Sequence, residues 1–269
     1  MALDNPAFSR NAAFSAQGQV AALSATELQD MYDRPAAPEP APRQVMTIEG
    51  TVRTSAVAFG LLVVGAAIGW ITVQAVPFLW IGAGLVGFVL ALVNIFKKEP
   101  SPALVLAYAG VQGVFVGGIS AFYEAQFPGI VAQAVLATLV VVGVTLALFA
   151  SGKIRASKKA TKIFLISMIG YAVFSLINLG LMLFGVNDDP WGLRSWDGIL
   201  GIPLGVIIGV FVVIMAAYSL VLDFDFVKQG VANRADAKYQ WTAAFGIMVT
   251  VIWLYLEILR ILAIAQSSD

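Results

Sequence analysis

Seven long apolar runs constrain this chain more than any other feature of its sequence. Separated by short polar breaks, they occupy residues 55–76, 78–96, 102–123, 129–151, 162–185, 199–223 and 241–264. A helix needs about 20 mainly apolar residues to cross the hydrocarbon core of a bilayer. Because lipid offers no hydrogen-bond partners, each run must satisfy its backbone polar groups within a helix. The runs therefore predict an all-α integral membrane protein, a bundle of seven transmembrane helices.

The composition supports this prediction and excludes several classes of function. Charged residues make up only 12% of the chain, whereas soluble domains carry roughly 25%. Cysteine and histidine are absent, which excludes disulfides, thiolate or imidazole metal sites and Ser-His-Asp triads. The net charge is zero, and the sequence contains no P-loop. We therefore expect no enzymatic activity, no cofactor or bound metal, and no nucleic-acid partner.

The first 54 residues differ from the rest and are predicted to form a disordered cytoplasmic tail. They include the proline-rich stretch PAAPEPAP at 35–42, which disfavours helix. They lack the basic start and apolar stretch of a signal peptide, so the first span should act as an uncleaved anchor. NPAFSR at 5–10 is echoed by NAAFSA at 11–16, either as a docking motif or by chance. The transmembrane domain is expected at 55–264 and a short C-terminal tail at 265–269.

The lysines and arginines predict the orientation, since they concentrate in cytoplasmic segments. Fourteen of the sixteen lie in the N-terminal tail and in the breaks after the second, fourth and sixth runs. Of the other two, Arg194 lies in the 185–198 break and Arg260 within the last run. The N-terminus is therefore predicted to be cytoplasmic and the C-terminus outside. We expect a multi-pass protein of the cell membrane, plasma or bacterial inner, in contact with the lipid bilayer.

Small residues recur at four-residue spacing in several runs. Examples are Gly65 with Gly69 and Gly113 with Gly117. Such faces let helix backbones approach closely. They predict packing within one bundle, with a dimer interface as the alternative.

Charged residues inside or at the ends of spans are costly and often functional. Asp223 and Asp225 end the sixth run. Two residues apart, they point about 200° apart on a helix, so at most one can face the bundle interior. They could form a solvated helix end, or an acidic gate at the cytoplasmic mouth. Glu257 and Arg260, at i,i+3 spacing in the seventh run, could be a structural pair or part of a polar pathway.

The order of several short motifs resembles that of the Bax inhibitor-1 family, also called transmembrane BAX inhibitor motif proteins, in a bacterial-type form. The third and fourth runs read GVQGVFVGGISAFYE and PGIVAQAVLATLVV, similar to the family's glycine-rich helix and its Q-A-x-x-x-T helix start. The sixth ends in LVLDFD, and the seventh contains LYLE where the family commonly has L-Y-L-D. The resemblance covers about residues 55 to 264.

This resemblance implies a bundle with the last helix near its centre, and a pH-sensitive calcium leak. It also implies that a carboxylate on each of the last two helices shares a proton and gates the path; carried over, these are Asp223 and Glu257, with Asp225 and Arg260 as neighbours. Two sequence features oppose direct sharing. Glu257 lies about 24 Å along a helix that starts near residue 241, while Asp223 lies near the inner surface. No arginine occurs in the second or third run, so Arg260 is the expected intramembrane cation.

Three function classes stay open at this point. The first is a bundle that leaks calcium or another cation under control of carboxylate protonation. The second is a non-conducting regulator that binds a membrane protease or another membrane protein through the tail. The third is an ion-coupled transporter, for which the sequence offers no convincing inverted repeat.

Overall fold

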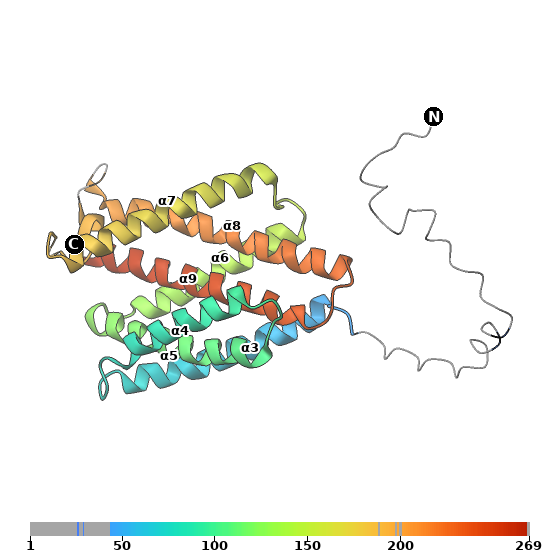
Figure 1. The fold of residues 1–269 in the computed structure, drawn as a ribbon. Helices are drawn as coiled ribbons and strands as arrows, with labels where there is room; N and C mark the ends of the chain where they lie inside the picture. Colours follow the sequence, from blue (N-terminus) through green and yellow to red (C-terminus); the bar gives the residue numbers. More distant parts are fainter. Residues whose placement is uncertain are drawn as a thin grey trace. The chain divides into compact units, whose positions relative to one another are not determined.

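A computed structural model describes residues 44–187, 189–196, 198 and 201–267, together with Thr26 and Gln29. Most of the predicted N-terminal tail lies outside these described residues, as do the last two residues of the chain. Within the described residues, seven long helices run back and forth through one bundle (Figure 1). They are α3 (Ile48–Thr72), α4 (Leu79–Phe96), α5 (Pro102–Gln126), α6 (Ile130–Ala150), α7 (Lys158–Leu183), α8 (Leu204–Ala232) and α9 (Tyr239–Ser267).

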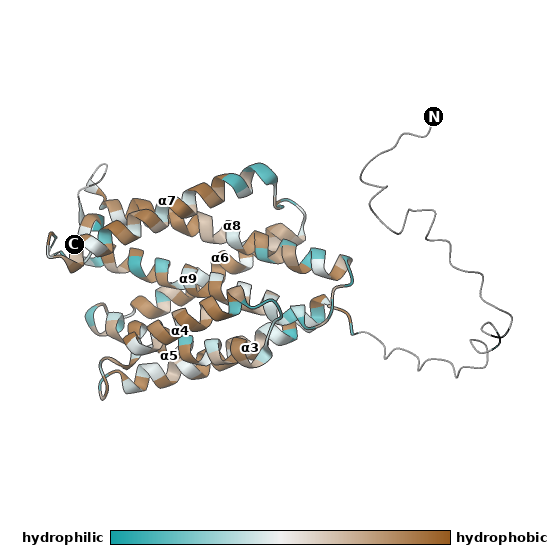
Figure 2. Cartoon of the chain, viewed as in Figure 1, coloured by the Kyte–Doolittle hydropathy of each residue, from teal (hydrophilic) through white to brown (hydrophobic). Residues whose placement is uncertain are grey.

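Each of these seven helices is long and apolar enough to cross a membrane. Hydrophobic residues cover the helices along much of their length, and hydrophilic residues gather toward the helix ends (Figure 2). The prediction of an all-α bundle with seven transmembrane helices is confirmed. We call the end with loops 97–101, 151–157 and 233–238 the basic end, and the other the opposite end.

Two predicted spans have boundaries that differ from the observed helix ends by five residues or more. The first helix begins at Ile48, where the Thr47 side chain accepts a hydrogen bond from the Gly50 amide (3.0 Å). The sixth apolar run was predicted to span 199–223, but α8 covers Leu204–Ala232. Hydropathy marks the part of a helix that meets lipid, whereas caps set where the helix ends.

The last residues of the predicted tail belong to the bundle. The Met46 amide donates to the carbonyl of Ala235 (2.7 Å), and Val45 forms an antiparallel bridge with Asp236. The Met46 side chain is buried in a small cluster with Val227 and Ala243. These contacts of Val45 and Met46 hold the start of α3 against the loop between α8 and α9.

The core lies around α9, which runs through the middle of the bundle in Figure 1. It buries residues along most of its length and packs against α3, α5, α6 and α8. By contrast, α4 and α7 each bury one residue, Gly87 and Asn178 respectively. The central position of the last helix, implied by the family resemblance, is therefore confirmed.

Glycines bring α3 and α5 into close contact. A Cβ added to Gly65 would collide with the carbonyl of Gly110, and one added to Gly113 would collide with the carbonyl of Leu62. The same holds for Gly117 against Ala66. These small-residue faces pack within the bundle, as predicted.

Candidate functional site

Glu257 is a buried carboxylate on α9, with only 1% of its surface exposed. Arg260, one turn later on the same helix, donates from Nη1 to Glu257 Oε2 at 2.7 Å. The Tyr171 hydroxyl of α7 donates to the same oxygen at 2.8 Å. Arg194 Nη1 approaches the other oxygen, Oε1, at 3.5 Å. Three chain segments therefore meet at one carboxylate.

Arg194 reaches this carboxylate from the loop between α7 and α8. It lies in a short 3-10 helix, η3 (Gly192–Ser195), and is 5% exposed. Its Nη2 donates to the Tyr171 hydroxyl (3.1 Å) and to Ser175 Oγ (3.3 Å). Its guanidinium also stacks over the rings of Tyr171 and Phe174, at 5.4 and 5.6 Å from their centroids.

The loop is held in place by Asn178, the buried amide of α7. Its Oδ1 accepts from the Leu193 amide at 2.7 Å, and its Nδ2 donates to the Trp191 carbonyl at 3.4 Å. Gly192, with φ +60, sits so close that a Cβ there would collide with the Asn178 side chain. The loop therefore turns inward and carries Arg194 into the bundle.

The role of Arg194 was missed by sequence reasoning. It was assigned only to the external break at 185–198, and Arg260 was expected to be the intramembrane cation. The structure pairs Arg260 with Glu257, and it buries Arg194 beside the same carboxylate. The expectation was therefore incomplete, because a second arginine joins the cluster. The available signal was a lone arginine in a break that otherwise carries acidic residues. Together the two arginines and one glutamate leave a formal charge of +1 in the cluster.

Asp223 occupies a different site, between α8 and α9. Its Oδ2 accepts a hydrogen bond from Thr250 Oγ1 at 2.7 Å, and Thr250 also contacts Ser219 Oγ at 3.3 Å. Gly246 on α9 faces the carboxylate, where a Cβ would lie 3.1 Å from Oδ1. Absence of a side chain at Gly246 lets the carboxylate approach the helix.

A cavity of about 420 Å³ at the basic end reaches Asp223. Its lining includes Asn94, Tyr239 and Thr242, whose side chains carry an amide or a hydroxyl, and the exposed Lys97 and Lys98. Carboxylate, amide and hydroxyl oxygens are ligands that hard cations accept. Within the described part of the chain, no three acidic residues lie close enough together to hold a metal ion.

Asp225 faces away from Asp223. Its Oδ2 accepts from Gln229 Nε2 at 2.5 Å, one turn later on α8. It lines another hollow, beside Lys158 and Lys162 of α7. The two aspartates thus point to different sides of the helix, as their spacing predicted.

The structure does not bring Asp223 and Glu257 together. Thr250, the partner of Asp223, precedes Glu257 by seven residues, or about 10 Å along α9. Val212 and Ala216 of α8 and Leu254 of α9 are fully buried in the turns between the two sites. An apolar layer therefore separates the two carboxylates, and they do not share a proton in this arrangement.

Sequence comparison relates the chain to a known protein family. The chain matches the family described as Bax inhibitor 1 like over residues 5–267. None of the curated proteins matches the chain.

Proposed function

The chain belongs to the Bax inhibitor 1-like family, and on that premise we propose that this multi-pass membrane protein is a proton-sensitive cation leak. Calcium is the proposed permeating ion, and Asp223 and Glu257 are the proposed gating carboxylates. The observation that carries the proposal is the position of Asp223: a carboxylate inside a transmembrane helix, at a cavity that reaches the basic end of the bundle.

Asp223 is the proposed ion-binding and proton-sensing group. When it is ionised, its charge attracts a cation into the cavity; when it is protonated, that attraction is lost. Lys97 and Lys98 also line the cavity, and their charge repels cations, so entry depends on an ionised Asp223. The flux should therefore rise as the pH rises. The carboxylate replaces part of the water shell of the ion, with help from Asn94 and Thr242, which also line the cavity.

Glu257 has a different proposed role, as a latch. Its bonds to Arg194, Arg260 and Tyr171 tie α7, η3 and α9 together at the far side of the apolar layer. A net positive cluster repels cations, so the closed latch and the apolar layer both oppose passage. Conduction requires α8 and α9 to separate at Val212, Ala216 and Leu254. The latch limits that movement because η3, which it ties to α9, also packs against α8.

Calcium uptake into liposomes tests the proposal. Purified protein is reconstituted into vesicles loaded with a calcium-sensitive dye, and uptake is followed from mildly acidic to mildly alkaline pH. We expect uptake above that of protein-free vesicles, increasing with pH. Folded protein that gives no uptake at any pH would contradict the leak and favour the non-conducting regulator.

A further inference from the structure

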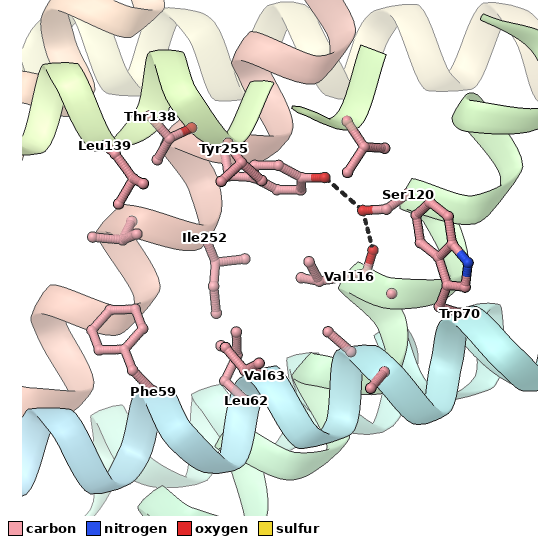
Figure 3. Close-up of a pocket in the computed structure, with 16 residues that line it drawn as sticks. Phe59, Leu62, Val63, Trp70, Val116, Ser120, Thr138, Leu139, Ile252 and Tyr255 are labelled. Carbon is pink, nitrogen blue, oxygen red and sulfur yellow. Dashed lines mark hydrogen bonds between the residues drawn. The ribbon is translucent and has the colours of Figure 1, made fainter. Parts of the chain in front are cut away.

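A groove of about 440 Å³ opens on the side of the bundle between α3 and α6, away from the polar sites (Figure 3). Its rim is formed by exposed apolar side chains of these two helices, among them Val63 (63% exposed) and Leu139 (63%). Its back is formed by buried residues of α5 and α9, including Val116, Ser120 and Ile252. The rim is part of the surface that faces lipid, so the groove is continuous with the bilayer.

The hydroxyl groups in the lining offer no free hydrogen-bond donor. Ser120 Oγ donates to the carbonyl of Val116 at 2.6 Å, and Thr138 Oγ1 donates to the carbonyl of Ala134 at 2.7 Å. The Tyr255 hydroxyl lies 2.6 Å from Ser120 Oγ. Because the single proton of Ser120 goes to Val116, Tyr255 must donate to Ser120. The hydroxyl groups of the back wall therefore offer no hydrogen-bond donor to a ligand, and a ligand meets a mainly apolar surface there.

Two other occupants fit this groove poorly. Water finds few partners on such a lining, and apolar cavities stay dry. A helix of another chain is rigid and about 10 Å wide with its side chains, so it cannot follow an irregular channel between packed helices. A flexible hydrocarbon chain is narrower and can follow an irregular channel. The volume of the groove lies within the range of about 300–1,000 Å³ typical of small-ligand sites.

We propose that this groove holds an acyl chain of a bilayer phospholipid, which enters sideways between α3 and α6. The lining comes from the second half of α3 and the first half of α6. Both halves lie toward the opposite end of the bundle, so the lipid belongs to the leaflet on that side. The inference is independent of the proposed leak, because it rests on the shape and chemistry of this groove alone.

Photocrosslinking tests the proposal directly. The full chain is reconstituted in nanodiscs made with a phosphatidylcholine that carries a diazirine near the end of one acyl chain. After illumination, labelled residues are mapped by mass spectrometry. We expect adducts on the back wall, at Val116, Ser120 and Ile252, which bulk lipid cannot reach because each is less than a tenth exposed. Adducts confined to outward residues such as Leu136 and Val140 (64% and 62% exposed) would overturn the proposal, as would crosslinks between two chains in their place.

Matched variants make the result specific. Val135→Trp places a large side chain at the rim of the groove, where Val135 is 41% exposed, whereas Val140→Trp places it on the same helix outside the groove. We expect back-wall labelling to fall several-fold in Val135→Trp and to stay unchanged in Val140→Trp. Ala67→Phe, at the α3 rim, should have the same effect as Val135→Trp, with Ala56→Phe outside the groove as its control. Equal labelling in all four variants would overturn the proposal.

Discussion

Glu257 shows how much one buried charge depends on residues far away in the sequence. Its neighbour Arg260 could be predicted, because i,i+3 spacing on a helix brings two side chains together. Arg194 and Tyr171 could not, because loop folding and the packing of α7 decide their positions. The two aspartates could be predicted only in part. Helix geometry predicted that the side chains of Asp223 and Asp225 point to different sides of the helix, but not that Thr250 would donate a hydrogen bond to Asp223.

The Glu257 cluster makes a stability prediction. Glu257→Gln leaves Arg194 and Arg260 close together without a counter-charge, and breaking a buried pair costs about 3–5 kcal/mol. We expect this loss in the free energy of unfolding, measured by denaturation in detergent micelles. Glu49→Gln, an exposed change in the first turn of α3, removes only a favourable interaction with the helix N-terminus and should cost at most about 1 kcal/mol. Equal stability of the two variants would mean that the cluster does not hold the bundle together.

At the scale of the helices, the sequence predicted which helices form, and in what order, better than it predicted the residues at which each helix ends. Each apolar run became one helix, because lipid requires a continuous hydrogen-bonded backbone. The run near 199–223 ended where hydropathy fell, yet α8 continues to Ala232. Polar residues such as Gln229 can extend a helix beyond the membrane, and its bond to Asp225 supports that turn. Hydropathy does not report such extensions.

The α3–α5 contact gives a prediction at this scale. Gly113→Val would drive a side chain into the carbonyl of Leu62, so the two helices must separate. Overpacking of this kind costs typically about 1–3 kcal/mol, and we expect a lower unfolding temperature in micelles. Gly143→Val on α6, where an added Cβ meets nothing within 4 Å, is the matched control. If both variants unfold at the same temperature, close glycine packing between α3 and α5 does not determine the stability of the bundle.

For the molecule as a whole, the orientation stays a prediction from charge. The chain has no cysteine, so single cysteines can be placed at either end of the bundle. Val186→Cys should react with a membrane-impermeant maleimide in intact cells, and Lys153→Cys only after permeabilisation. Both residues are exposed. The reverse pattern would place the basic end outside and contradict the predicted topology.

The apolar layer between the two carboxylates predicts a gain of function. Leu254→Ser introduces a hydroxyl where Leu254 is fully buried, which favours entry of water into the layer. Calcium uptake by reconstituted vesicles should rise, with a weaker dependence on pH. Leu256→Ser, about 200° away on α9 and only half-buried, should leave uptake near that of the wild type. Unchanged uptake in Leu254→Ser would show that the barrier lies elsewhere.

The resemblance implied a shared proton between the last two helices, and the folded chain separates these carboxylates instead. The position of Glu257 far along the last helix already indicated this separation. The apolar layer, and the bonds of Glu257 to Arg194 and Arg260, depend on helix and loop packing that the sequence did not predict. The family match supports the class of protein, and Asp223 now carries the proposed proton sensitivity without Glu257 as a direct partner.

The most direct measurement is the pH dependence of calcium uptake in Asp223→Asn beside Asp225→Asn. Both changes remove one negative charge from the same helix, but only Asp223 lines the cavity at the basic end, whereas Asp225 lines a different hollow. We expect Asp223→Asn to abolish the rise of uptake with pH, whereas Asp225→Asn should keep it. A pH-dependent uptake that survives in Asp223→Asn would show that Asp223 is not the proton-sensing group.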